Sequence, residues 1–330
     1  MYIIEIIPYL RTMKTPGSQR YKKEKQKRTN KSKTRKLRNL NCHPITHGKT
    51  ISKHSCFTRD TIIQIRDAYN KQYTENPIVV DTACDIWKEL RKRLPNCNNE
   101  DCWVENVQAP SVREYLRKRM FVPKQPASWK DEPKKWLNTT DIKNVLSQYM
   151  ESHPNFIALG VVPIDFDAEP YHGGDICVDR AFCQFNLQEQ IDAGKTKIGA
   201  VFNLDKHTGS GTHWVSLFID VENPLIFFMD SGGEKAPKEV ITFVKRVQEQ
   251  AKNLNTPIDN MPFIQNHPME HQQENTECGV YCIHFITTML TGRVGSRKQI
   301  NTNDKKIKYF TEQSIPDDDM FKMRKKYFNP

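Results

Sequence analysis

The stretch that decides the fold of this chain is Gln272-Gln273-Glu274-Asn275-Thr276-Glu277-Cys278-Gly279-Val280-Tyr281-Cys282. The residues after it, 283–290, are almost all apolar and predict a buried helix. Cys278 then lies in the first turn of that helix, beside unpaired backbone N–H groups and the positive end of the helix dipole. Both features favour the thiolate, which is the nucleophilic form of cysteine. A free cysteine is more often a small buried hydrophobe, so this motif alone does not establish catalysis.

Two short apolar runs upstream of Cys278 supply partners for it. Residues 215–219 and 225–229 predict two adjacent strands joined by a tight turn. His213 stands at the start of the first strand and Asp230 at the end of the second, and an antiparallel pairing brings these two ends together. His213 is then the base and Asp230 the group that orients it. Either residue alone would more often be structural, but all three at element ends favour a cysteine nucleophile.

The order of these residues resembles the ubiquitin-like-protein proteases, the cysteine peptidases that include the SUMO-specific and adenovirus enzymes. The pattern consists of His213-Trp214, Asp230-Ser231, Gln272 and Cys278-Gly279. The 17 positions from His213 to Asp230 and the 6 positions from Gln272 to Cys278 fit that family. The resemblance covers roughly the last 200 residues, a size that suits one domain. The motif at 276–281 and the basic leader are most similar to members from large DNA viruses.

The resemblance implies a role for each site residue. Cys278 attacks the carbonyl carbon and forms a thioester, while His213 takes the thiol proton and later protonates the leaving amine. Asp230 fixes the imidazole tautomer. Gln272 donates an amide N–H to the developing oxyanion beside the backbone N–H of Cys278, with Gln273 as the alternative donor. Cys282, one turn further along, is expected to pack in the core.

Two tryptophans carry the expected substrate preference. In the family, tryptophans that match Trp136 and Trp214 wall a narrow channel, and only residues without a Cβ fit between two indoles. The resemblance therefore implies cleavage after Gly-Gly. Trp136 opens a segment similar to the family's Trp-Leu-Asn-Asp, but Thr139 stands where the family usually has Asp. Without the family, Trp214 would be a half-buried core aromatic.

The charge of the chain is concentrated in a leader. The net charge is +11, and residues 11–38 hold thirteen Lys or Arg and one Glu, for a local charge of +12. This leader has almost no apolar residues, so it is predicted to be disordered. Such a run binds nucleic acid or acidic surfaces, or serves as a nuclear import signal. We therefore expect DNA, nucleoprotein or capsid contact through the leader.

The cysteines and histidines predict no metal site and no disulfide framework. The chain has nine cysteines, an odd number, and neither a convincing signal peptide nor a stretch able to span a membrane. We therefore expect free thiols in a reducing compartment, no membrane partner and no secretion. A zinc site built from Cys42, His43, His47, His54 and Cys56 matches no standard finger. No cofactor is expected.

The fold class predicted is α+β, with a papain-like or adenain-like protease core around a mostly antiparallel central sheet. The predicted domains are a disordered basic tail at 1–40, a helical arm-like domain at 41–125 and a cysteine protease domain at 126–330. A Pro-rich linker is expected at 121–135. Helices are predicted at 58–73, 82–94, 111–120, 139–149, 238–252 and 318–327, and strands at 156–164, 197–203, 214–219, 225–229 and 261–265.

The function predicted is a thiol endopeptidase that processes viral structural polyproteins after Gly-Gly during virion maturation. The expected location is the virion and the host cytoplasm, with the nucleus as an alternative. Three other functions fit the same residues. One is a SUMO or ubiquitin-like deconjugating isopeptidase, and one is an acyltransferase of the same clan. The last is a DNA- or capsid-binding protein with a relic protease core, against which the complete set of catalytic residue types argues.

Overall fold

The computed structural model describes residues 37–169, 176–295 and 298–330. The basic leader predicted at 11–38 lies outside the described residues, apart from its last two. Residues 38–330 form one compact unit. Among the helices described there, none is long and apolar enough to cross a membrane.

The N-terminal part of this unit is helical, as predicted. Thr58 and Thr82 cap the first two long helices, because their side chains accept hydrogen bonds from the backbone N–H groups of Thr61 and Asp85. Aromatic and aliphatic side chains such as Phe57 and Trp103 fill its core. The elements are η1 (Pro44–Thr46), α2 (Arg59–Gln72), α3 (Ala83–Arg93), α4 (Asp101–Val104) and α5 (Pro110–Met120).

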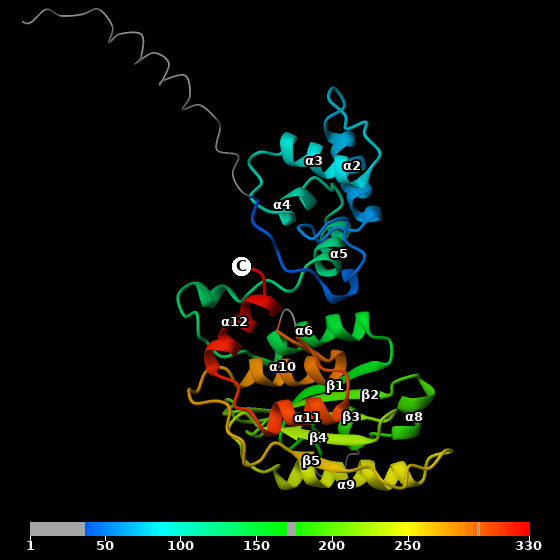
Figure 1. The fold of residues 1–330 in the computed structure, drawn as a ribbon, viewed down its shortest axis with the longest axis vertical. Coiled ribbons are helices and arrows are strands. Elements are labelled where there is room, and N and C mark those ends of the chain that lie inside the picture. The colour runs from blue at the N-terminus through cyan, green and yellow to red at the C-terminus, as the bar shows by residue number, and fades with distance from the viewer. Residues whose placement is uncertain (1–36, 170–175, 296–297) are drawn as a thin grey trace, which may run out of the picture. The chain divides into compact units, whose positions relative to one another are not determined.

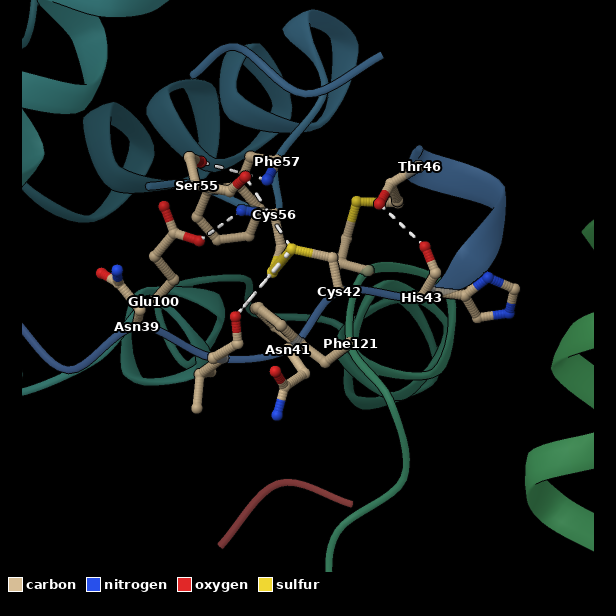
Figure 2. The surroundings of a disulfide bond; sticks show 12 residues. Asn39, Asn41, Cys42, His43, Thr46, Ser55, Cys56, Phe57, Glu100 and Phe121 are labelled. Carbon is tan, nitrogen blue, oxygen red and sulfur yellow. Dashed lines mark hydrogen bonds between the residues drawn. A yellow bond between two sulfur atoms is a disulfide. The ribbon is translucent and has the colours of Figure 1, made fainter. Parts of the chain in front are cut away.

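Disulfide bonds overturn the prediction of free thiols. The structure pairs Cys42 with Cys56, Cys97 with Cys102, and Cys177 with Cys183. Figure 2 shows the first pair, which joins the segment before η1 to the segment before α2. Tertiary folding brings the Cα atoms of Cys42 and Cys56 to 5.0 Å, within disulfide range, which their separation in sequence does not reveal. The cysteine pattern therefore gives no support for a reducing compartment.

The catalytic part is built on one five-stranded sheet with the strand order β1-β2-β3-β4-β5 (Figure 1). The strands are β1 (Phe156–Pro163), β2 (Lys197–Asn203), β3 (Trp214–Asp220), β4 (Leu225–Met229) and β5 (Phe263–Gln265). The two central pairs are antiparallel, but β1 pairs with β2 and β4 with β5 in parallel. The sheet is therefore mixed rather than mostly antiparallel. Helical crossovers, α7 and α8 before β2 and α9 before β5, return the chain to run parallel to its neighbour.

Helices cover both faces of this sheet. One core packs α6 (Thr139–Ser152) and α10 (Cys278–Thr291) against the sheet, and the other packs α9 (Lys238–Lys252) against the opposite face (Figure 1). Residues 278–289 of α10 are all buried, so the predicted buried helix is confirmed. The other elements are η2 (Ala127–Lys130), α7 (Arg180–Cys183), α8 (Leu187–Asp192), β6 (Arg293–Val294), β7 (Lys298–Gln299), α11 (Asn303–Thr311) and α12 (Asp317–Tyr327).

The expected linker at 121–135 is held against the rest of the unit. Asn329, near the C-terminus, accepts a hydrogen bond at its backbone carbonyl from the N–H of Gln125, at 2.6 Å. Its side chain accepts from the N–H of Asn41 at 2.8 Å and donates to the carbonyl of Asn41 at 2.9 Å. The C-terminal residues thus tie the start of the helical part to the segment that enters the catalytic part. The boundary predicted at 125/126 stays a prediction.

Candidate active site

Cys278 is the first residue of α10, at the position that the sequence predicts. Its N-cap residue, Glu277, makes no side-chain capping hydrogen bond, so its side chain occupies none of the first-turn N–H groups, although its carbonyl accepts from the N–H of Val280. Cys278 is 2% exposed. Gly279 is needed for close packing, because a Cβ there would lie 3.1 Å from the Cβ of Leu137. The cysteine therefore sits where the helix lies closest to the segment before α6.

The structure brings His213 and Asp230 together. His213 immediately precedes β3 and Asp230 immediately follows β4, and these strands are antiparallel. The Nε2 atom of His213 lies 2.6 Å from the Oδ1 atom of Asp230. The Nδ1 atom is the remaining ring nitrogen, and it is the atom that would act as the base. The two apolar runs thus form the antiparallel pair that the sequence predicts, with the start of β3 beside the end of β4.

The electrostatics of His213 favour a protonated ring. Burial alone lowers the pKa of His213, but the hydrogen bond to Asp230 and the proximity of the Cys278 thiol outweigh it and raise the pKa to about 10. At neutral pH the ring is therefore an imidazolium, which stabilises a neighbouring thiolate. Cys282 contrasts with this pair, because complete burial raises the pKa of its thiol. As predicted, Cys282 packs in the core.

Sequence reasoning missed the residue that holds Asp230. The buried side chain of Asn266 accepts a hydrogen bond from the Asp230 N–H at 2.9 Å and donates to the Asp230 carbonyl at 2.7 Å. The N–H of Gly232 donates to Asp230 Oδ1 at 2.8 Å. These contacts fix the carboxylate that orients His213. No motif in the sequence marks Asn266, since it lies 36 positions from Asp230.

Gln272 lies in the loop before Cys278, and hydrogen bonds fix the orientation of its side-chain amide. Its Oε1 accepts a hydrogen bond from the buried hydroxyl of Ser231 at 2.8 Å, and its Nε2 donates to the carbonyl of Glu274. An amide nitrogen has two hydrogens, so one donor remains for an oxyanion. The side chain of Gln273 is exposed, and its backbone N–H bonds Asp317. The geometry therefore favours Gln272 over Gln273 as the ordered donor.

The two predicted channel residues differ in burial. Trp214 is 7% exposed, and its indole N–H donates to the carbonyl of Leu137 at 3.0 Å. Trp136 precedes Leu137 and is 41% exposed. It lines an open groove together with residues 132–135, Thr276 and Phe321. The hydrogen bond of Trp214 thus fixes the segment before α6 that presents Trp136, while the Trp136 indole itself is partly exposed to solvent.

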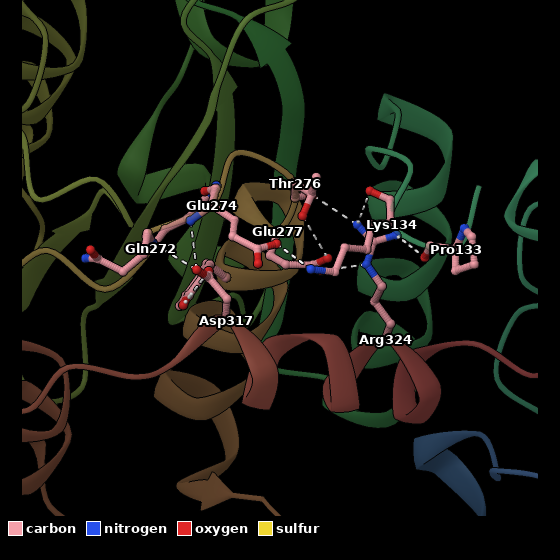
Figure 3. Close-up of polar contacts among 10 residues, drawn as sticks. Pro133, Lys134, Gln272, Glu274, Thr276, Glu277, Asp317 and Arg324 are labelled. Carbon is pink, nitrogen blue, oxygen red and sulfur yellow. Dashed lines mark hydrogen bonds and ion pairs between the residues drawn. The ribbon is translucent and has the colours of Figure 1, made fainter.

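A buried ion pair between Arg324 and Glu277 lies between the loop before Cys278 and the segment before Trp136 (Figure 3). Arg324 on α12 is 1% exposed, and its Nε donates to Oε2 of Glu277 at 2.5 Å. The same guanidinium donates to the carbonyl of Lys135 at 2.6 Å and to that of Thr276 at 3.0 Å. It also stacks 4.5 Å from the ring of Trp129. Arg324 therefore holds residues 276 and 277, directly before Cys278, next to Lys135, directly before Trp136.

The family follows from this site and from the sequence comparison. Residues 195–329 match the Ulp1 protease family, C-terminal catalytic domain, and this span contains all four candidate catalytic residues. The catalytic part of this chain, residues 195–329, belongs to the Ulp1 protease family. It is a cysteine protease, and its substrates are proteins. Within the described residues, no cluster of three or more metal-capable side chains is present.

Several viral proteins are similar to this Ulp1-family protease. The chain is 22% identical over 268 residues to a thiol protease of Acanthamoeba polyphaga mimivirus, covering 76% of this chain and 84% of that protein. It is 24% identical over 260 residues to a cysteine protease of African swine fever virus, covering 74% and 89%. The crystal structure of the African swine fever virus protease has a TM-score of 0.58 at 18% identity, covering 89% of this chain and 97% of that one. The shared fold includes the N-terminal helical part.

Proposed function

We propose that this protease is an endopeptidase that cleaves after Gly-Gly in viral structural polyproteins during virion maturation. The proposed nucleophile is Cys278, with His213 as acid and base, Asp230 as its orienting group and Gln272 as oxyanion donor. The similarity to viral proteases over about three quarters of the chain supports a viral role.

The observation that carries the Gly-Gly preference is the hydrogen bond from the Trp214 indole to the carbonyl of Leu137. It ties the residue beside His213 to the residue beside Trp136. An extended substrate that passes between these indoles toward Cys278 has no room for a side chain, so it requires glycine. Trp136 is free to close on the substrate because its indole is not packed in the core.

The test is a peptide panel assayed with wild type and with Trp214→Ala. Replacing either glycine of a good Gly-Gly-X peptide by alanine should lower kcat/KM about 100-fold, because a methyl group displaces the backbone from the attack geometry. Trp214→Ala should lower activity on Gly-Gly and partly relax the rejection of alanine. If wild type cleaves alanine peptides as fast as Gly-Gly peptides, the proposed tryptophan channel is wrong, but the proposed catalytic residues are unaffected.

Deconjugation of a ubiquitin-like protein is the second candidate. It is favoured by the name of one African swine fever virus relative, which is described as a SUMO-1 cysteine protease. Ubiquitin-amide and SUMO-amide substrates assayed beside the peptides separate the two functions. Efficient cleavage of SUMO-amide with poor cleavage of Gly-Gly-X peptides would favour the isopeptidase.

We also propose that the basic leader brings the enzyme to DNA or nucleoprotein in the virion and host cytoplasm. Thirteen cationic side chains in residues 11–38 support electrostatic binding that weakens steeply with salt. A variant that begins at Asn39 should retain peptide turnover and lose salt-sensitive DNA affinity. Unchanged DNA affinity in that variant would refute this role for the leader.

A further inference from the structure

A second concave site lies away from Cys278. It is a cleft of about 1130 Å³ between residues 42–55 and the ends of three helices of the catalytic part. Its floor includes Gln148 and Tyr149 of α6, and its far wall includes Thr287 of α10 and residues of α12. Thr287 and Thr291 both line it, near the C-terminal end of α10. Cys278 begins the same helix, so about 20 Å separates the two sites.

All of the charged side chains that line this cleft are positive. Four of its residues carry permanent positive charge, and three more are histidines, whereas none is a carboxylate. The cations are Lys49, Lys53, Arg293 and Lys326, and the histidines are His43, His47 and His153. None of the four cations forms a salt bridge with any residue in the described part of the chain. Many other surface cations of this protein do have such partners, so the cleft stands apart.

The positive charge of the cleft comes from its lysines and its arginine, because burial lowers the pKa of each of the three histidines and leaves each ring neutral at pH 7. Burial lowers the pKa of Lys326, and burial together with Arg293 lowers the pKa of His47. The Nη2 atom of Arg293 lies 3.3 Å from Nδ1 of His47. A carboxylate outside the lining, that of Glu151, lies 3.5 Å from Nε2 of His43. That buried nitrogen makes no hydrogen bond with any described residue.

From this arrangement we propose that the cleft binds a multiply phosphorylated anion. A phosphate carries about 1.5–2 negative charges and several acceptor oxygens, so two or three phosphates balance the four cations. The hydroxyl group of Ser52 and the second amide hydrogen of Gln299 add hydrogen-bond donors for phosphate oxygens. Arginine and lysine both bind phosphate strongly through charge-assisted hydrogen bonds. A free oligophosphate and a short stretch of nucleic-acid backbone present the same chemistry.

The test compares two full-length variants with equal loss of charge. The cleft variant carries Lys49→Gln, Lys53→Gln, Arg293→Gln and Lys326→Gln. The control variant carries Lys235→Gln, Lys238→Gln, Lys245→Gln and Lys252→Gln, at exposed positions on or near α9, across the sheet. Calorimetric titration in low-salt, phosphate-free buffer uses three probes: tripolyphosphate, a short single-stranded oligonucleotide and a poly-glutamate peptide. Peptidase activity checks that each variant is folded, because both sets lie away from Cys278.

The expected result is that wild type and control variant bind tripolyphosphate alike, while the cleft variant binds at least about tenfold more weakly. If only the oligonucleotide shows this cleft dependence, nucleic-acid backbone is the source of the phosphates, and the proposal stands. Equal tripolyphosphate affinity in the cleft variant and wild type, with no cleft dependence for the oligonucleotide, would overturn it. Poly-glutamate that binds the cleft as tightly as tripolyphosphate would overturn the phosphate assignment.

Discussion

The two ends of α10 face opposite kinds of chemistry. At the N-terminal end, Cys278 begins the helix, beside the positive end of the dipole, and belongs to the same candidate site as the protonated His213. At the C-terminal end, Thr287 and Thr291 line the carboxylate-free cleft. The dipole is negative at that end and favours cations. The middle of the helix is buried and apolar. The comparison therefore teaches that α10 contributes to the candidate active site and to the cleft only through the residues at its two ends.

The largest expected effect comes from replacing each of the two cysteines of α10 by alanine in turn. Cys278→Ala should abolish peptide cleavage, because Cys278, at the start of α10, is the proposed nucleophile. Cys282→Ala should retain most activity, since Cys282 is a buried neutral thiol one turn further on. Steady-state kinetics on a Gly-Gly-X peptide measures both, with circular dichroism as the folding control. Equal loss in two folded variants would refute the assignment of the nucleophile.

The second prediction concerns the proton on His213. Its raised pKa means that the imidazolium persists through neutral pH and is lost as pH rises through about 10. The profile of kcat/KM should therefore fall only near that pH. Asp230→Asn removes one group that raises the pKa, so its alkaline limb should move to lower pH, with a loss of up to about 10⁴-fold in kcat. An alkaline limb that stays in place would show that Asp230 does not set the state of His213.

The third prediction tests what holds the N-terminal end of α10 in place. Arg324→Met leaves Glu277 charged and buried, which should cost about 3–5 kcal/mol of unfolding free energy. Chemical denaturation measures this loss. Arg324→Met combined with Glu277→Met should restore part of it. Lys322→Ala breaks the exposed pair with Asp319 on the same helix and should change stability little. A similar loss for both single variants would contradict a buried ion pair.

The smallest expected effect is that of the oxyanion donor. Gln272→Ala should lower kcat about 10²–10³-fold with little change in KM, because the donor acts on the transition state. Gln273→Ala is the matched control, since its side chain is exposed, and it should retain near wild-type kcat. The reverse order of effects would assign the donor to Gln273.

Local signals predicted most of the fold. The strands at 197–203 and 225–229 and the helix at 238–252 begin and end where expected, because apolar periodicity and flanking turns define them. The pairing of His213 with Asp230 followed from the order of two strands. The contacts of Asn266 and Arg324 join residues distant in sequence, which no local pattern encodes. The parallel edges of the sheet were missed for the same reason. Two of the disulfides join cysteines only 5 and 6 positions apart, but the odd number of cysteines favoured free thiols instead.

The most direct test of the central claim is covalent capture of the nucleophile. A Gly-Gly peptide with a C-terminal vinyl sulfone presents an electrophilic carbon where the scissile carbonyl would lie, and peptide mapping by mass spectrometry locates the adduct. We expect one rapid adduct on Cys278 that forms much more slowly in His213→Ala, while Cys84, an exposed free thiol, reacts slowly. An adduct on Cys84 or Cys282 with Cys278 unmodified would contradict the account.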